Sequence, residues 1–290
     1  MSDRLVVTAV AKNVGRNARR VFGRLAGLAG AFEDLAFVVY ENNSTDSTKS
    51  ELERLAREVP NFRLISEDLS RAEIESFARA RHMDGSPCRI ELIARGRNIA
   101  RQALLSDFGD YDQVLVIDPD ALWFSRRDIL RNAGRISRDE ADAICANGLT
   151  KWLYYRDAFA FRSRAHPWGP EYLGEGWWRE TKPKIQGRYR GTTLVPVNSA
   201  FGGAALYSMA AYRQGRYLAM ADERYIEQQA GYDTSGAPSE ERSAAAAKPM
   251  ANSDYSGPIV CEHVPFCYSL REAGFGRIFI DPAWRLLFRD

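Results

Sequence analysis

Two aspartates at the end of an apolar run are the residues of this chain best suited to chemistry. The run Val114–Ile117 is followed directly by Asp118-Pro119-Asp120. In an extended backbone, residues i and i+2 project from one face, so the two carboxylates would share that face. Pro119 also favours an extended Asp118. Carboxylates offer oxygen ligands, which suit Mg²⁺ or Mn²⁺. We predict a divalent metal at Asp118 and Asp120, with an ordinary strand-end turn as the alternative.

A second polar cluster follows an earlier apolar run. Leu35–Tyr40 is followed by Glu41-Asn42-Asn43-Ser44-Thr45-Asp46. Helix capping is the competing explanation for the end of this turn. A carboxylate at Glu41 suits a ribose hydroxyl or a base N–H donor, as acidic residues do in other nucleotide folds. We therefore predict that Glu41, Asn43 and Asp46 take part in nucleotide binding.

Arginines precede the aspartate pair. Arg95, Arg97 and Asn98 lie in a predicted helix over 90–105. Guanidinium groups bind phosphates through paired hydrogen bonds, so Arg97, with Asn98 beside it, could meet a diphosphate that the metal also holds. A solvated helix face is the alternative, for Arg95 above all.

The elements that must position these residues are those of an α/β protein. Apolar strands alternate with helices of apolar periodicity. The predicted strands are 5–10, 35–40, 62–65, the run ending at 118, 141–145 and 277–280, and the predicted helices are 18–32, 47–59, 90–105 and one that ends before Gly274. This alternation predicts a mostly parallel central sheet flanked by helices, with ligands beyond the carboxyl ends of its strands.

Two segments interrupt this pattern. Residues 151–197 hold four of the six tryptophans, which predicts an aromatic-rich insertion that is either a second small core or an aromatic binding wall. Residues 222–258 are rich in Ala, Ser, Gly and charge, which predicts a long mobile loop.

The amino-acid composition argues against several classes of protein. Lys and Arg total 40 against 38 Asp and Glu, and no long block of one charge suggests a nucleic-acid partner. The four cysteines lack metal-binding spacing, which favours reduced thiols in a cytoplasmic protein. No apolar segment approaches the roughly 20 residues that a membrane-spanning helix needs. We expect a soluble protein with no transmembrane segment and at most peripheral membrane contact.

Motifs in a characteristic order carry a family resemblance. The turn Glu41–Thr48, Arg97-Asn98, the run Asn198–Gly203 and Cys261-Glu262-His263-Val264 accompany Asp118-Pro119-Asp120. Together they are similar to the fungal capsule-associated α-1,3-mannosyltransferases and their bacterial relatives, within the nucleotide-sugar glycosyltransferases of the GT-A fold. The resemblance excludes the aromatic insertion and the predicted loop.

The resemblance implies roles for the donor side. Asp118 and Asp120 would bind Mn²⁺ or Mg²⁺ that bridges the donor diphosphate, and Gly202 and Gly203 would line the sugar pocket, with a simple turn as the alternative for the glycines. Residues 1–150 would form the nucleotide-sugar-binding half, and residues 151–290 would complete the same domain as the acceptor-binding half.

The resemblance also implies roles beside the acceptor. Glu262 or His263 would remove the acceptor proton, and His263 could instead bind the metal or be a buried structural residue. After Pro282, where many GT-A enzymes carry a metal-binding histidine, this chain runs Ala283-Trp284-Arg285. In the aromatic segment, Trp177 or Trp178 is favoured over Trp152 for contact with a sugar acceptor, and ordinary core packing is the alternative.

The predicted function is a metal-dependent hexosyltransferase that moves a sugar from a nucleotide donor, GDP-mannose or a UDP-sugar, to a glycan or other hydroxyl acceptor. Two alternatives stay open. A haloacid-dehalogenase-like phosphatase also has an apolar strand that ends in Asp-x-Asp, and a GT-A-like module could bind sugar without turnover.

Overall fold

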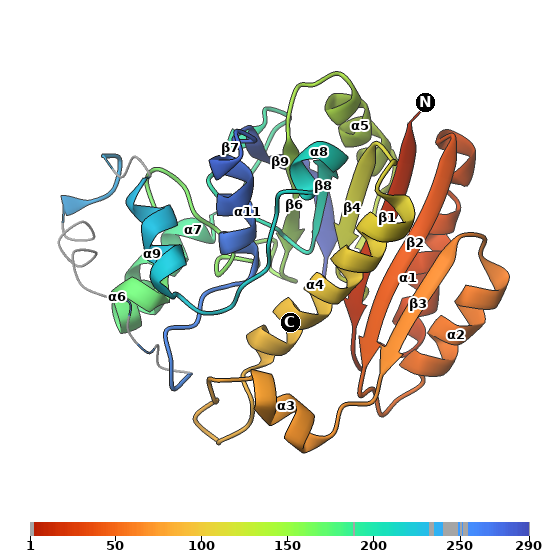
Figure 1. The fold of residues 1–290 in the computed structure, drawn as a ribbon. Helices are drawn as coiled ribbons and strands as arrows, with labels where there is room; N and C mark the ends of the chain where they lie inside the picture. The colour runs from red at the N-terminus through yellow and green to blue at the C-terminus, as the bar shows by residue number, and fades with distance from the viewer. Residues whose placement is uncertain are drawn as a thin grey trace.

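A nine-stranded sheet organises the part of the chain described in this computed structural model, which comprises residues 3–187, 189–231, 235–239, 249, 251 and 255–289 (Figure 1). The strand order is β3-β2-β1-β4-β8-β6-β9-β5, and β7 pairs with β9 outside this path. The strands are β1 (Arg4–Ala11), β2 (Asp34–Asn42), β3 (Phe62–Glu67), β4 (Gln113–Ile117), β5 (Trp123–Phe124), β6 (Ala143–Leu149), β7 (Val195–Pro196), β8 (Ala204–Ser208) and β9 (Ile278–Leu287).

Helices cover both faces of this sheet. They are α1 (Arg16–Ala26), α2 (Thr48–Glu58), α3 (Arg71–Phe77), α4 (Arg89–Phe108), α5 (Arg126–Ser137), α6 (Pro170–Gly176), α7 (Lys182–Ile185), α8 (Met209–Tyr212), α9 (Glu223–Ala230) and α11 (His263–Glu272), with short helices η1 (Ala29–Ala31) and η2 (Trp177–Thr181). In Figure 1, α4 crosses in front of β1 and β2, while α1 and α2 lie behind the sheet.

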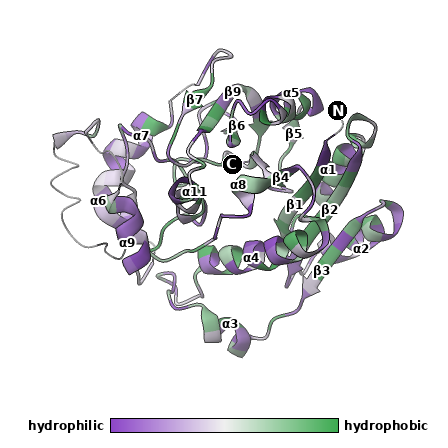
Figure 2. Ribbon diagram, turned by 45° about the horizontal axis from the view of Figure 1, so that its top comes forward, coloured by the Kyte–Doolittle hydropathy of each residue, from purple (hydrophilic) through white to green (hydrophobic). Residues whose placement is uncertain are grey.

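The first half of the chain forms the parallel part of the sheet. β1 pairs in parallel with β2 and with β4, and β2 pairs in parallel with β3. Alternate residues enter separate cores, with Val6 on the α4 side and Val7 on the α1 side. Burial on both faces explains why β1 and β2 are hydrophobic almost throughout (Figure 2). The predicted α/β fold class is confirmed.

The second half adds strands to the same sheet. β8 runs antiparallel between β4 and β6, and β9 runs parallel to β6. The sheet is therefore mixed, yet β4, β6 and β9 point the same way. Their carboxyl ends join those of β1, β2 and β3 at one edge, where ligands bind in sheets of this kind.

The aromatic segment is mainly a core of its own. Trp177 and Tyr155 are fully buried and Trp168 nearly so, whereas Trp152 is 67% exposed. A buried ion pair also holds this segment, since Arg162 Nη2 lies 3.0 Å from Glu171 Oε1. Trp177, predicted as an acceptor contact, is thus enclosed in the core, and Trp178 is half-buried.

The prediction of a mobile loop over 222–258 is wrong for the first part of this segment. Residues 223–230 form α9, which begins where Asp222 accepts a hydrogen bond from the Tyr225 amide. Tyr225 is buried and donates its hydroxyl to Glu171 at 2.7 Å. Tyr225 thus attaches α9 to the aromatic core, and Gln229 adds a hydrogen bond to the Pro167 carbonyl at 2.8 Å. Residues 232–234, 240–248, 250 and 252–254 lie outside the described residues. None of the described helices combines the length and apolar character needed to span a bilayer.

Candidate active site

Asp118 and Asp120 lie at the carboxyl-end edge of the sheet. β4 ends at Ile117, and the Asp118 amide then donates to the Gly203 carbonyl at 2.8 Å. Both carboxylates reach solvent, with exposed fractions of 25% and 48% for the two side chains. Partial burial, and then the Asp118 carboxylate, raise the pKa of Asp120. Two carboxylates that repel each other at an open edge fit a divalent cation, which would relieve that repulsion.

Arg97 links this aspartate pair to the last helix. Its Nη2 lies 3.1 Å from Asp118 Oδ1, and its Nε lies 3.0 Å from Glu262 Oε1. The guanidinium is almost completely buried and lies over the rings of Phe201 and Tyr217. Burial lowers the pKa of Arg97, but the carboxylates of Glu262 and Asp118 outweigh this effect and raise it. Arg97 is therefore a fixed positive charge between the two predicted functional carboxylates.

The residues Gly202 and Gly203 form a tight turn beside Asp118. Their φ angles are +66° and +83°, in the region that favours glycine. A Cβ on Gly202 would lie 2.0 Å from the Ala146 carbonyl oxygen, and one on Gly203 would lie 2.2 Å from the Phe288 ring. The turn therefore needs glycine at both positions to bring its backbone against β6 and against Phe288, the residue that follows β9.

Asp157 and Arg156 complete the site, although sequence reasoning missed both. Asp157 Oδ2 accepts a hydrogen bond from the Gly202 amide at 3.0 Å. Arg156 Nη2 lies 4.0 Å from Asp120 Oδ2. Partial burial raises the pKa of Asp157 to about 6, against the opposing effect of Arg156 and with a further contribution from Asp118. In the sequence, Arg156 and Asp157 stand out only as an adjacent Arg-Asp pair inside the aromatic segment, and this pair belongs to none of the motifs described above.

Glu262 and His263 begin α11 and are both buried. Glu262 Oε1 holds Arg97, and His263 Nε2 lies 3.6 Å from the same oxygen. The His263 ring stacks on Phe201, with centroids 3.8 Å apart. Burial, and then Arg97, lower the pKa of His263 well below its usual value. A neutral, enclosed imidazole is a weak base.

The predicted metal set of Asp118, Asp120 and His263 is not assembled. The described residues contain no group of three or more His, Cys, Asp and Glu side chains that could hold a metal ion. Because the His263 ring is enclosed against Phe201, its metal-ligand role is not supported. The two aspartates remain as a pair, so a cation there would need further ligands from a donor diphosphate and water.

The turn after β2 is held by its own hydrogen bonds. Glu41 is fully buried and accepts from the Ser44 amide at 2.9 Å and from the Ser66 hydroxyl at 2.5 Å. Asn43 has a φ of +50° and donates to the Leu69 carbonyl at 2.8 Å. Glu41 and Asn43 therefore stabilise the turn at the sheet edge, and their contact with a nucleotide stays a prediction.

Asp46 and Asn98 also have internal partners. Asp46 Oδ1 accepts from the Thr48 amide at 2.9 Å, while the Asp46 side chain is exposed beside the turn. Asn98 donates to the Tyr217 carbonyl at 2.7 Å and accepts from the Tyr217 amide at 3.2 Å. Both polar atoms of Asn98 thus anchor the segment before α9. Arg95, in turn, pairs with Glu67 at 2.6 Å, away from Asp118.

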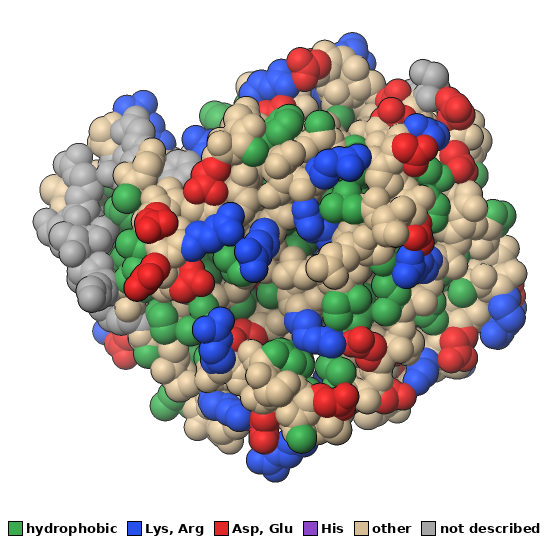
Figure 3. All heavy atoms as spheres, viewed as in Figure 1, with side chains coloured by type: hydrophobic (Ala, Val, Ile, Leu, Met, Phe, Trp, Pro, Cys, Tyr) green, Lys and Arg blue, Asp and Glu red, His purple; other side chains and the backbone are tan. Residues whose placement is uncertain are grey.

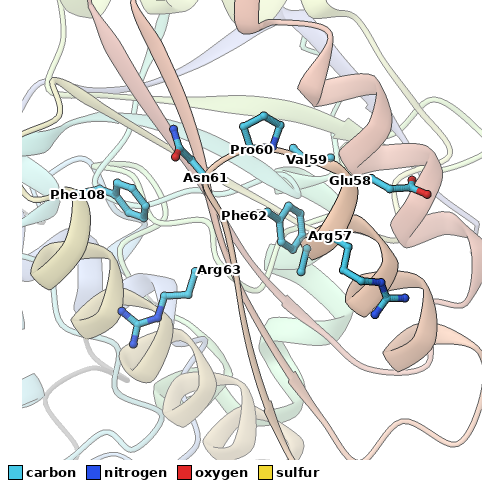
Figure 4. Close-up of a pocket in the computed structure, with 9 residues that line it drawn as sticks. Arg57, Glu58, Val59, Pro60, Asn61, Phe62, Arg63 and Phe108 are labelled. Atoms are coloured by element: carbon cyan, nitrogen blue, oxygen red, sulfur yellow. The ribbon is translucent and has the colours of Figure 1, made fainter.

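A surface hollow of about 500 Å³ lies elsewhere (Figure 4). It is lined by residues 56–63 and Phe108, at the amino end of β3. The predicted ligand edge is at the opposite ends of the strands. This hollow therefore contributes nothing to the site at Asp118.

The arrangement of sheet and site defines the class of protein. Parallel strands lead to an Asp-x-Asp pair, with a glycine turn and the start of the last helix linked to it, as in glycosyltransferases of the GT-A fold. A family model described as Cryptococcal mannosyltransferase 1 matches residues 18–241, and the chain belongs to this family. The predicted family resemblance is confirmed. No curated protein sequence matches the chain.

Solved structures of similar fold were also found. S. aureus TarS 1-349 has a TM-score of 0.46 and 12% identity, over 99% of this chain and 60% of that chain. A mannosyltransferase from Pyrobaculum calidifontis, in complex with GDP-Man and Mn²⁺, has a TM-score of 0.46 and 12% identity, over 99% of this chain and 57% of that chain. Glucosyl-3-phosphoglycerate synthase from Mycobacterium tuberculosis, with Mn²⁺ and UDP, has a TM-score of 0.41 and 13% identity, over 81% of this chain and 68% of that chain. The chain spans about 60% of the length of the TarS chain it matches.

Proposed function

We propose that this protein transfers a sugar from a nucleotide-diphosphate donor, GDP-mannose or a UDP-sugar, to a hydroxyl group of a glycan, in a metal-dependent reaction. The observation that carries the proposal is the open pair of Asp118 and Asp120 at the carboxyl end of β4, within a chain of a mannosyltransferase family. Burial, and then repulsion by the Asp118 carboxylate, raise the pKa of Asp120, and a cation at this pair would relieve that repulsion.

The donor side of the proposed site uses Asp118, Asp120 and the glycine turn. A divalent cation, when bound, would stabilise the negative charge that builds on the departing nucleoside diphosphate. The tight turn at Gly202 and Gly203, which packs against Ala146 and Phe288, would present its backbone to the sugar of the donor. Asp157 orients the Gly202 amide, and Arg97 holds Asp118 in place.

The acceptor side of the proposed site uses Glu262. Arg97 fixes its Oε1 at 3.0 Å, while Oε2 faces the Cys261 thiol at 3.6 Å. We propose that Glu262 takes the proton of the acceptor hydroxyl as the new glycosidic bond forms. His263 then serves to pack the start of α11 against Phe201 and Tyr217.

Asp120→Asn tests the metal assignment, because it removes one negative charge with little change of shape. We expect calorimetry in Mn²⁺ to show nucleotide-sugar binding weakened at least about tenfold, the scale of one lost charge-assisted contact. Glu262→Gln is the matched control, since it should keep donor binding and slow transfer instead. Undiminished binding by Asp120→Asn would contradict the proposal.

The same assays separate the alternatives. Release of nucleoside diphosphate supports glycosyl transfer. Release of inorganic phosphate from a phosphate ester would support the phosphatase, and binding of a nucleotide sugar without turnover would support a module that only binds sugar.

A further inference from the structure

Basic residues gather along α1 and the loop that precedes it. Between Lys12 and Phe32 the chain carries five basic residues and no acidic one. The five are Lys12, Arg16, Arg19, Arg20 and Arg24, and all are exposed. On the face viewed in Figure 3, by contrast, basic and acidic side chains are interspersed. The helix α1 lies behind the sheet in that view, so its charge belongs to a different side of the molecule.

This basic strip continues onto β5 and the start of α5. Arg20 donates to the Leu122 carbonyl at 2.6 Å, and the Arg24 guanidinium lies 5.2 Å from the Phe124 ring centroid. Arg126 donates to the Gly27 carbonyl at 3.0 Å. Arg126 and Arg127 are exposed and extend the positive charge, and Trp123 beside them is 44% exposed.

The turn after β6 adds an exposed apolar tip. Trp123 is paired with Leu287 of β9, and Leu287 is paired with Leu149, the last residue of β6. In the turn that follows, Trp152 is 67% exposed and Leu153 is 55% exposed. Leu153 also has a φ of +63°, which is strained for a residue other than glycine. The fold thus holds large apolar side chains out of its core at the end of a strand that points to the site.

We propose that the surface formed by α1, β5 and the turn 150–154 docks on a lipid bilayer with anionic head groups. We call it the α1–β5 surface. Exposed arginines are attracted to anionic head groups, and tryptophan is favoured at the boundary between head groups and acyl chains. Leu153 would enter the acyl region, which gives an exposed aliphatic side chain an apolar environment.

A lipid surface fits these residues better than a nucleic acid does. Both partners are anionic, so arginines alone do not choose between them. An aliphatic tip such as Leu153 has no polar or stacking contact to offer a nucleic acid, whereas bilayer insertion removes its apolar area from water. The site edge would then face acceptors that are attached to a membrane.

Vesicle sedimentation with the full chain tests the α1–β5 surface. We expect the protein to bind phosphatidylcholine vesicles that contain phosphatidylglycerol, to bind pure phosphatidylcholine weakly, and to be released as ionic strength rises. Arg16→Glu/Arg127→Glu should weaken binding at least about tenfold, because each basic residue near an anionic membrane makes a substantial contribution. Trp152→Ser/Leu153→Ser should weaken the part of binding that survives added salt.

Two exposed arginines on the other half of the chain provide the matched control. Arg216→Glu/Arg224→Glu makes the same change of charge and should leave vesicle binding unchanged. All changed side chains are exposed, so circular dichroism should show an intact fold in each variant. No binding of the wild type to anionic vesicles overturns the proposal, as does an equal loss in the control. Binding to a DNA duplex in the absence of vesicle binding also overturns it. Vesicle binding is read without donor or acceptor, so its failure is distinct from failure of the transferase assay.

Discussion

At the scale of single residues, His263 shows how burial decides chemistry. Its ring is 1% exposed and stacked on Phe201, and neither ring nitrogen has a hydrogen-bond partner among the described residues. A proton on this ring would have to be taken up without water and beside the Arg97 charge. The residue is therefore neutral in the folded protein, whereas an acidic side chain at the same position would be costly to bury.

The stability of the protein should depend on pH through His263. Its pKa is lowered well below 6.5 in the folded state, while the unfolded chain titrates near 6.5. The unfolded state thus binds more protons below about pH 6.5, so stability falls as pH falls through this window and is constant above it. From about pH 7.5 to about pH 5.5 we expect the contribution of His263 to lower the free energy of unfolding by an amount on the order of 1 kcal/mol.

Urea denaturation of the wild type and of His263→Phe measures this loss. Phenylalanine keeps the ring stacked on Phe201 and cannot be protonated, so the other titrating groups cancel in the comparison. The difference between the two proteins should change with pH by the stated amount. Parallel curves for the two proteins would show that His263 is protonated as easily in the folded state as in the unfolded state.

At the scale of elements, the glycine turn joins β8 to the end of β4. Gly202 lies against the backbone of β6, since a Cβ on Gly148 would lie 2.2 Å from the Gly202 carbonyl oxygen. Gly203 lies against Phe288, and the Gly203 carbonyl accepts a hydrogen bond from the Asp118 amide. The position of the aspartate pair therefore depends on how closely these strands approach each other.

Gly203→Ala should destabilise the protein by about 2–4 kcal/mol. The added Cβ would clash with Phe288, and alanine disfavours a φ of +83°. Chemical denaturation measures the change. Gly23→Ala is the control, because nothing lies within 4 Å of its Cβ and alanine is the better helix former in α1. Equal effects of the two substitutions would contradict the close approach at Gly203.

At the scale of the whole molecule, Arg97 connects parts of the chain that are far apart in sequence. Glu262 is 165 positions away along the chain, and Asp118 is 21 positions away. One guanidinium on α4 thereby joins the end of β4 to the start of α11, and with them the donor and acceptor sides of the proposed site. Its burial makes this connection sensitive to the loss of either charge.

Arg97→Met should lower the free energy of unfolding by about 3–5 kcal/mol, because it leaves Glu262 buried without its cation. Thermal and urea denaturation measure the loss. Arg71→Met is the control, since Arg71 pairs with Glu75 on the surface of α3 and is 90% exposed, so little change is expected. A small effect of Arg97→Met would mean that the ion pair is not needed to hold the two parts together.

The sequence alone determined the local features of this protein. The alternation of apolar strands and helices predicted the α/β fold, because each pattern reports which faces of an element are buried. The sequence also predicted that Asp118 and Asp120 act as a pair, because the strand geometry and Pro119 that place them act within a few residues. The boundaries were less accurate, as α1 ends at Ala26 where a longer helix was predicted.

Only the tertiary structure decided which residues meet. The pairing of Arg97 with Glu262, the approach of Asp157 to the Gly202 amide, and the enclosure of His263 join separate segments. The short strand β8 and the helix α9 were missed for the same reason. Each is stabilised by contacts with distant elements, as in the bond from Tyr225 to Glu171, and such contacts leave no periodic pattern in the chain.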